Sequence, residues 1–297
     1  MKWTGIGWRR CIPTSMEYVL PAAKSEKLRI NPSREVRMPE LPEVETIVRG
    51  LREAITGATV EKLQVIDPRI SLPEKEIIGK RIAAIERRGK YIVFKLAPSG
   101  ALIFHLRMSG RLLRVCAEGE GRYSRLVLHL DSGVLRFVNP RRLGTVEYSA
   151  NGFPHELGVE PLSDAFTVHQ LRRLLAGSRR PVKPFLMDQR KIAGLGNIYA
   201  SEALWRAEID PRRAANTITA KEARALHRGI VSVLQEAIEH MGTTFSDYRD
   251  SDGNKGGFQD YLAVYGKEGR KCSRCGTEII RVNQGGRSTY LCPGCQK

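Results

Sequence analysis

The chain has few acidic residues and no long apolar run. Its 297 residues include 32 Asp and Glu but 49 Lys and Arg, so its formal net charge is +17 at pH 7. Residues 1–37 contain no apolar stretch as long as the central region of a signal peptide, and no segment has the composition of a transmembrane helix. No internal repeat is visible. These absences argue against a secreted or membrane-spanning protein, and the charge favours a partner that is itself negative.

A nucleic acid is the partner that such a charge favours most, since an isoelectric point near 9.9 is typical of proteins that neutralise phosphates. A generally basic cytosolic protein is the alternative on charge alone. The hydrophobic content of 41% is that of a globular protein, and the length allows about two domains. We predict a cytoplasmic, nucleoid-associated monomer with no membrane partner.

The apolar pattern predicts a strand-rich first half. Apolar residues recur at helical spacing from Val44 to Ile55, with Gly57 as a candidate C-cap. Short extended segments follow, with turns at Pro98–Gly100 and Asp131–Gly133. The predicted strands are Thr59–Ile66, Arg81–Glu86, Tyr91–Leu96, Ala101–Met108, Arg125–Leu130 and Val134–Val138. Several short strands at this spacing are typical of a β-sandwich or barrel.

The second half changes to a helical pattern near Glu160–Asp164. The predicted helices are Val168–Leu175, Pro184–Arg190, Asn197–Ala207 and a longer one with Leu226, Ile230, Leu234, Ile238 and Met241 on one face. Gly194 and Gly196 precede the third helix, and a glycine-containing turn between helices can present backbone N–H groups to a phosphate. Asp252–Gly257 is interpreted as a mobile loop. The fold class is therefore α+β with more than one domain.

Cysteines near the C-terminus have the spacing of a zinc ribbon. The C-x2-C-x16-C-x2-C pattern comprises Cys272, Cys275, Cys292 and Cys295. Four thiolates close a tetrahedral shell around Zn²⁺ and leave no open position, so the predicted site is structural. Two disulfides are the alternative, which the absence of a secretion signal disfavours. Arg281–Leu291 is typical of a hairpin, and Arg287 after its turn can reach a phosphate. Cys11 and Cys116 are predicted to be ordinary thiols.

Residues 38–46 contain a candidate nucleophile. If Met38 initiates translation and is removed, Pro39 becomes the first residue and carries a free secondary amine. That amine beside the carboxyl group of Glu40 combines a nucleophile with a proton donor, and such a pair can form an iminium intermediate with an electrophilic carbon. The alternative is an ordinary helix start, because Pro is common in the first turn and Glu40 and Glu43 suit the positive end of the helix dipole.

Six separated segments together resemble the formamidopyrimidine-DNA glycosylase family, over residues 38–297. They are the zinc-ribbon cysteines and the motifs Pro39–Thr46, Arg88–Tyr91, His105–Gly110, Asn139–Gly144 and Gly194–Glu202. Each motif alone is weak, but all six occur in the family's order. The resemblance implies an N-terminal β-sandwich with flanking helices, a helical helix–two-turn–helix domain and a C-terminal zinc ribbon that holds one Zn²⁺.

The resemblance also implies domain boundaries and a reaction. Residues 1–38 would be a leader absent from the mature protein, followed by the catalytic sandwich at 39–163, the helix–two-turn–helix domain at 164–265 and the ribbon at 266–297. The implied activity removes oxidised purines, such as 8-oxoguanine and formamidopyrimidines, from double-stranded DNA through a Schiff base. Strand cleavage at the abasic site by β/δ-elimination would follow.

The resemblance assigns catalytic roles to particular residues of this chain. Pro39 would be the nucleophile, Glu40 the essential acid and base, and Lys90 a proton donor carried on a hairpin. Arg287 would join this catalytic set by holding a phosphate next to the lesion, and Glu43 matches a further active-site position. Without the family, an exposed strand lysine is the simpler interpretation of Lys90.

Further residues would contact DNA. Asn197 would hold another phosphate beside the lesion, His105 a third one, and Lys183 matches a position near the site. A helix N-cap is the alternative for Asn197, and that role is compatible with phosphate binding. A half-buried histidine with satisfied hydrogen bonds is the alternative for His105.

Three residues would fill the gap that a flipped nucleotide leaves in the stack. Met108 and Arg141 match the family's inserted residues. The third position is usually Phe in the family but is Leu143 here. Leu can still insert, but it loses aromatic stacking on a base, which is worth ~1–3 kcal/mol.

The leader is the largest departure from the family. Within the full chain Pro39 is an internal amide without a nucleophilic lone pair. We therefore predict that translation begins at Met38; the alternatives are cleavage of the leader, or a catalytically silent lesion-binding protein. An endonuclease VIII-like enzyme for oxidised pyrimidines is the closest alternative function. Leu41 and a loop at Asp252–Phe258 that could close over a flipped base favour the purine enzyme.

Overall fold

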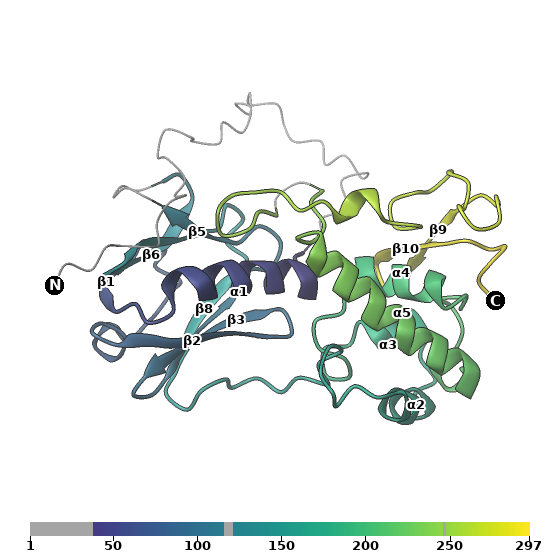
Figure 1. Ribbon diagram of the computed structural model, residues 1–297, viewed down its shortest axis with the longest axis horizontal. Helices are drawn as coiled ribbons and strands as arrows, with labels where there is room; N and C mark the ends of the chain where they lie inside the picture. Colours follow the sequence, from purple (N-terminus) through teal and green to yellow (C-terminus); the bar gives the residue numbers. More distant parts are fainter. Residues whose placement is uncertain (1–37, 116–120, 246–247) are drawn as a thin grey trace.

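The structure, a computed structural model, describes residues 38–115, 121–245 and 248–297. Figure 1 shows an elongated molecule in which strands gather at one end and helices and the C-terminal hairpin at the other. The long helix α1 (Leu41–Ile55) runs from the strands toward the helical end. Within the described residues, no helix has the length and apolar character needed to cross a membrane. Cys11 and Cys116 lie outside these ranges.

Helix α1 contributes to both hydrophobic cores. Leu41 at its start packs with the helical half, and the residues that pack with the strands are Val44, Ile47, Val48, Leu51 and Ile55. Its C-cap is Thr56, and Gly57 follows at φ +93. The prediction of Gly57 as the C-cap is therefore wrong by one position, because the left-handed residue that glycine favours comes directly after the cap.

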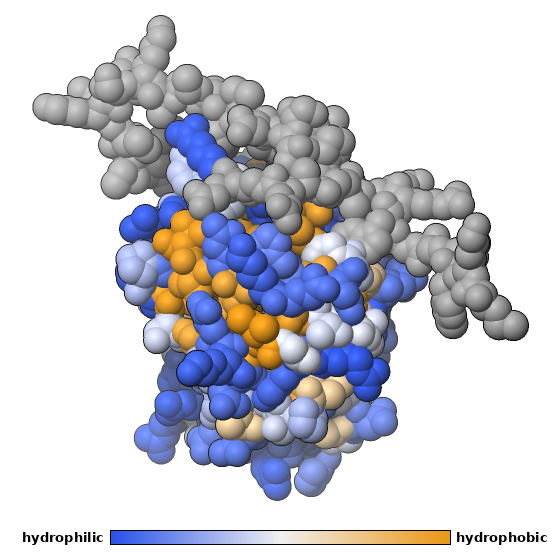
Figure 2. All heavy atoms as spheres, turned by 90° about the vertical axis from the view of Figure 1, so that its left-hand side faces the viewer, coloured by the Kyte–Doolittle hydropathy of each residue, from blue (hydrophilic) through white to orange (hydrophobic). Residues whose placement is uncertain are grey.

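Two four-stranded antiparallel sheets form the strand-rich half. One has the order β1-β6-β7-β5, with bounds Val60–Val65, Ser124–Leu130, Gly133–Val138 and Arg111–Val115. The other has the order β2-β3-β4-β8, with bounds Arg81–Arg88, Tyr91–Ala97, Ala101–His105 and Thr145–Ser149. Their facing side chains share one core, which includes Ile82, Phe94, Phe104, Leu112, Leu126 and Phe137. The predicted β-sandwich is confirmed. Figure 2 shows that its end presents an apolar area among hydrophilic side chains.

Two strands of the sandwich are absent from the sequence prediction. Both β5 and β8 lie at the edge of a sheet. Both are only five residues long, and charged residues in them, Arg111 and Arg114 in β5 and Glu147 in β8, weaken the apolar pattern that marks a strand. The predicted strand Ala101–Met108 is too long, since β4 ends at His105. Arg107 has φ +51, which is incompatible with an extended strand.

The helical half contains α2, α3, α4 and α5, with bounds Val168–Ala176, Val182–Leu186, Asn197–Arg206 and Ala220–Glu239. Short 3-10 turns occupy Glu74–Glu76, Ala215–Thr217 and Phe258–Asp260. Helix α5 begins with a capping box between Thr219 and Glu222. The predicted helix Pro184–Arg190 is wrong in its bounds: α3 starts earlier and ends at Leu186, after which the chain turns toward Gly194.

The predicted C-terminal hairpin comprises β9 (Ile280–Gln284) and β10 (Arg287–Leu291), joined by a turn at Gly285 and Gly286. It shares the core of the helical half, since Cys272, Tyr290 and Cys292 belong to the same buried cluster as α4 and α5. The ribbon is therefore packed on the helices. This arrangement of sandwich, helices and ribbon confirms the predicted α+β fold class.

Candidate active site

A cavity of about 690 Å³ is lined by residues from the sandwich, α4 and the ribbon hairpin. Its lining includes six of the residues selected from sequence: Glu40, Lys90, Met108, Leu143, Asn197 and Arg287. These residues come from segments as distant as the first helix and the last hairpin. The tertiary fold thus brings the predicted acid Glu40, the predicted proton donor Lys90, two wedge residues and two phosphate-binding residues to one place.

The Glu40 carboxylate lies at the first turn of a second helix. Glu40 is the N-cap of α1, and its carboxylate accepts hydrogen bonds from the backbone N–H groups of Ile198, at 2.9 Å, and Tyr199, at 3.4 Å, in α4. Burial raises the pKa of Glu40, while Lys90 and these amides oppose the shift. A carboxyl group that keeps its proton to higher pH is suited to general acid catalysis.

Gly196 permits this close approach. A Cβ atom at residue 196 would lie 2.3 Å from Cδ of Glu40 and 2.6 Å from Nζ of Lys90. No larger residue fits there without displacing both charged groups. Gly196 is also the N-cap of α4, so the alternative interpretation of Asn197 as the N-cap is wrong, and the Asn197 side chain is directed to other partners.

Lys90 lies in the two-residue turn between β2 and β3 and is 5% exposed. Burial lowers the pKa of Lys90; Glu40 opposes that effect and Arg287 adds to it. An ordinary exposed strand lysine is therefore excluded. The raised pKa of Glu40 and the lowered pKa of Lys90 bring the two groups toward a common range, in which they can exchange a proton with a reacting molecule.

Three charged residues that sequence reasoning missed hold the hairpin that carries Lys90. The backbone N–H of Gly89 donates to Glu160 at 2.6 Å. Arg87 donates to Glu160 at 2.5 Å and to Glu45, on α1, at 2.9 Å. The hairpin tip is thereby anchored to α1 and to the segment that follows the sandwich. In the sequence, that segment is marked only by the change to a helical pattern near Glu160.

Glu43 forms a second buried carboxylate centre. It accepts the backbone N–H of Glu40 at 2.8 Å, that of Thr243 at 2.7 Å, and the hydroxyl of Tyr199. Burial and the neighbouring Glu40 raise the pKa of Glu43 to about 7. Glu43 therefore holds the peptide group that follows Pro39. Tyr199 lies within the Gly194–Glu202 motif, but nothing in the sequence links it to Glu43.

The predicted wedge residues lie on two loops that are tied together. Leu143 is 44% exposed, Arg141 is exposed and Met108 is partly exposed. The Ser109 hydroxyl accepts the N–H of Arg141 at 3.2 Å and donates to Asn139 at 3.3 Å. These contacts fix the relative position of the two loops.

Backbone strain accompanies the wedges. Arg107 and Arg142 have φ of +51 and +53, and each is next to a wedge residue. A non-glycine residue in this region costs about 1–3 kcal/mol, and such strain often accompanies a functional constraint. The two strained residues lie beside Met108 and Leu143, whose apolar side chains line the cavity.

The predicted DNA-binding residues differ in their surroundings. Arg287 is exposed at the start of β10 and lines the cavity. Lys183 is 1% exposed, and its ammonium group donates to Asn197 Oδ1 at 2.6 Å, Ser288 O at 3.0 Å and Thr289 Oγ1 at 2.7 Å. Lys183 thus orients Asn197 and β10 from within the protein.

His105 is buried at the end of β4 and is neutral. Burial, with Arg107 and Lys90 nearby, lowers the pKa of His105 to about 3. Its Nδ1 accepts the backbone N–H of Arg107 at 3.1 Å, so Nε2 carries the proton. A phosphate contact by His105 would therefore be a neutral hydrogen bond.

The Asp252–Phe258 loop is attached to the sandwich in this structure. Asp252 accepts from Arg114 Nε at 2.8 Å, and the N–H of Arg114 donates to Ser251 O at 3.0 Å. Closure of this loop over a flipped base stays a prediction.

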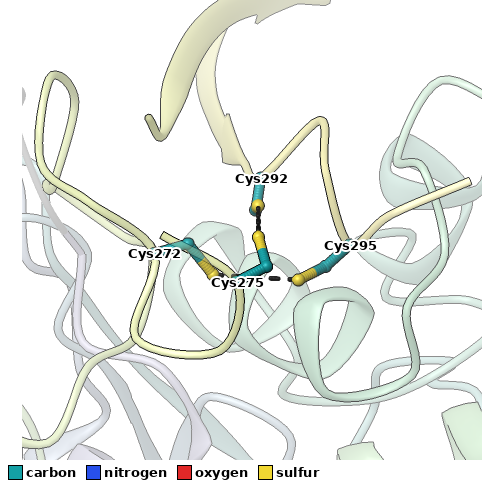
Figure 3. A group of neighbouring side chains, drawn as sticks. All are labelled: Cys272, Cys275, Cys292 and Cys295. Carbon is teal, nitrogen blue, oxygen red and sulfur yellow. Dashed lines mark hydrogen bonds between the residues drawn. The ribbon is translucent and has the colours of Figure 1, made fainter. Parts of the chain in front are cut away.

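The four cysteines of the ribbon point toward one another (Figure 3). Their sulfur atoms all lie within 4.8 Å of one another, with 3.4 Å between Cys275 and Cys292 and 3.8 Å between Cys272 and Cys295. Zn–S bonds of about 2.3 Å in a tetrahedron put the sulfurs about 3.8 Å apart, whereas a disulfide needs about 2.05 Å. The residues fit one structural zinc ion, as predicted.

Known protein families match the chain in three consecutive parts. The formamidopyrimidine-DNA glycosylase N-terminal domain matches residues 38–146, the H2TH domain of the same glycosylase matches 157–249, and a zinc finger found in FPG and IleRS matches 269–297. This combination defines a zinc-finger DNA glycosylase. A formamidopyrimidine-DNA glycosylase from Heliobacterium modesticaldum is 44% identical over 277 residues, with 88% of this chain and 100% of the relative covered. The chain belongs to the formamidopyrimidine-DNA glycosylase family.

Solved structures agree with the fold. The MutM (Fpg) protein from Thermus thermophilus has a TM-score of 0.81 and 42% identity, over 87% of this chain and 98% of that one. A Lactococcus lactis Fpg variant in complex with DNA containing Fapy-dG has a TM-score of 0.80 and 37% identity, over 87% and 100%. The resemblance stated from sequence motifs is confirmed.

Proposed function

We propose that this chain is a base-excision repair enzyme that removes 8-oxoguanine and formamidopyrimidines from double-stranded DNA and then cleaves the strand at the abasic site. The observation that carries this proposal is the buried Glu40 and Lys90 pair in a cavity shared with Arg287 and two wedge residues. The names of the relatives, and the similarity to an Fpg bound to Fapy-dG DNA, support the substrate class.

The proposed reaction uses an amine at Pro39. Its nitrogen attacks C1′ of the flipped nucleotide, the bond from C1′ to the base breaks, and the departing base takes a proton from the Lys90 ammonium group. Glu40 supplies a proton to the sugar ring oxygen as the ring opens, and the nitrogen loses its own proton as the iminium forms. Loss of a C2′ proton then expels the 3′ phosphate, and a second elimination expels the 5′ phosphate. Glu43 keeps the Pro39–Glu40 peptide in place through the Glu40 N–H.

The active form begins at Pro39 in this proposal. A free amine requires that Met38 is the initiating residue or that the leader is removed. In support, the N-terminal family domain matches from residue 38, and 88% of this chain covers the whole of the Heliobacterium relative. We further propose domains at 39–163, 164–265 and 266–297, a monomeric state and a cytoplasmic, nucleoid-associated location.

A substrate panel tests the proposal against its closest alternatives. Duplexes of one sequence would contain 8-oxoguanine, a formamidopyrimidine, 5-hydroxycytosine or no lesion. We expect rapid excision of the two oxidised purines and slower excision of the pyrimidine, measured as cleaved strand on a denaturing gel. Faster excision of 5-hydroxycytosine would favour the endonuclease VIII-like alternative. Tight binding without cleavage by the form that starts at Pro39 would contradict the proposed reaction, whereas the silent lesion-binding alternative applies to the chain that retains its leader.

Arg287→Ala should weaken binding to lesion-containing DNA without loss of zinc. The guanidinium lies at the cavity and, in our proposal, neutralises one phosphate, so its removal should make the slope of log K against log salt shallower by about 0.9. Fluorescence anisotropy at several salt concentrations measures the slope, and metal analysis measures the zinc.

Arg281→Ala is the matched control, because Arg281 lies on the other strand of the hairpin and donates to Ser288 at 3.0 Å. Equal losses in both variants would indicate a general charge effect. Parental affinity of Arg287→Ala at every salt concentration would show that Arg287 contacts no phosphate.

A further inference from the structure

The C-terminal end of α4 lies on the first zinc knuckle. Trp205, in the last turn of α4, donates its indole N–H to Sγ of Cys272 at 3.5 Å. Arg274, between the first two zinc cysteines, donates to the carbonyl oxygen of Trp205 at 3.1 Å. Its guanidinium also lies 4.2 Å from the centre of the Trp205 ring. One tryptophan therefore contacts both a zinc ligand and the loop between two ligands.

The contact with sulfur has an electrostatic consequence. Four thiolates around Zn²⁺ carry a net charge of −2, and Cys272 is only 3% exposed. Charge on a buried sulfur requires hydrogen-bond donors, and an indole N–H can only donate. Hydrogen bonds of this kind to metal ligands orient the ligand and alter metal affinity. The Trp205 N–H is therefore placed to stabilise the Cys272 thiolate.

The same helix reaches the candidate active site at its other end. Asn197 opens α4, and Arg287 opens β10, whose last residue precedes Cys292. At the cavity, Lys183 ties helix and strand together by donating to Asn197 and to Ser288. At the far end, the zinc shell and Trp205 join them again. Helix α4 and strand β10 are thus connected at both ends. The two connections are about 15 Å apart, which is the length of a ten-residue helix.

We propose that Trp205 is a positioning residue of the zinc centre. Its N–H holds the Cys272 thiolate and sets the register of the ribbon against α4, and with it the spacing between Asn197 and Arg287. The consequence for DNA rests on the proposed function, whereas the hold on zinc does not.

Zinc capture by a chromogenic chelator, 4-(2-pyridylazo)resorcinol, tests the hold on zinc in the full 297-residue chain. Trp205→Phe keeps an aromatic ring but removes the N–H, and we expect zinc affinity to fall about 10–100-fold. Arg206→Ala is the matched control. Arg206 is the next residue of α4, and its guanidinium donates to Ser232 at 3.1 Å and to Glu236 at 2.6 Å, both on α5. Its zinc affinity should remain parental.

Cobalt substitution separates the hydrogen bond from simple packing. Removal of a hydrogen bond raises the energy of the sulfur lone pair, so the sulfur-to-cobalt charge-transfer band should move to longer wavelength in Trp205→Phe and stay in place in Arg206→Ala. Replacement of Trp205 by the isosteric 3-benzothienylalanine preserves the shape and also lacks the N–H. It provides the same test if Trp205→Phe does not fold.

An abasic-site duplex tests the register. At saturating zinc, the two variants that lack the Trp205 N–H should bind this duplex more weakly than the parent and Arg206→Ala do. If both Trp205→Phe and the benzothienylalanine variant keep the parental zinc affinity and the parental cobalt band, the proposal is overturned. That outcome does not depend on whether the parent protein excises damaged bases. If both variants bind the duplex with parental affinity, Trp205 does not set the register of the ribbon against α4.

Discussion

Sodium borohydride should trap a covalent complex between 8-oxoguanine duplex DNA and the chain that starts at Pro39, but not with the 297-residue chain. Trapping requires an iminium, and an iminium requires a free amine. In the longer chain the Pro39 nitrogen is an amide without an available lone pair. Denaturing electrophoresis of labelled DNA measures the retarded complex. This is the largest effect that we expect, since a whole reaction step is present or absent.

Two further forms identify the nucleophile. Pro39→Gly in the short chain should retain some trapping through its primary amine, whereas chemical acetylation of the amino terminus should abolish it. Intact-mass measurement of the cellular protein shows which form exists. Efficient trapping by the chain with its leader intact would refute the mechanism, because another amine would have to be the nucleophile.

Glu40→Gln should fold and bind damaged DNA but excise very little. The amide preserves the shape of the side chain and one hydrogen-bond acceptor for the N–H groups of α4, but it cannot relay a proton. Positioned acid–base catalysis is worth ~10²–10⁴-fold, and we expect single-turnover excision to fall by that factor.

Glu53→Gln, an exposed position on the same helix, is the matched control and should excise at the parental rate. Thermal unfolding of both variants checks the fold, because Glu40 joins the starts of α1 and α4. An activity loss of less than about tenfold would assign Glu40 a structural role at the helix ends and remove it from the chemistry.

Regular local patterns predicted most of the fold. Central strands β3 and β6 each contain a run of three apolar residues, Ile92–Phe94 and Leu126–Leu128, and α5 has an apolar face with a capping box, so their positions follow from short-range patterns. Edge strands β5 and β8 have no such pattern, and the strand predicted to reach Met108 ends early, before a left-handed residue. These errors arose where solvent exposure or backbone strain removed the local signal.

The candidate site could be predicted only as a set of residue types. Motif order identified Glu40, Lys90, Asn197 and Arg287, and the structure brings them to one cavity. It also places Lys183 within the protein and gives His105 no charge, neither of which a motif can show. The catalytic and DNA-binding roles of these residues stay proposals until the variants are measured.

By itself the sequence determined the family, the zinc-binding cysteines and the sandwich, because each depends on residue identity at short or regular spacing. Only the tertiary structure decided how the site is held. Glu43 meets Tyr199 across 156 residues of chain, Gly89 meets Glu160 across 71, and Trp205 meets Cys272 across 67. Such contacts form when separate elements pack together, and a single hydrogen bond between distant residues leaves no periodicity in the chain from which it could be predicted.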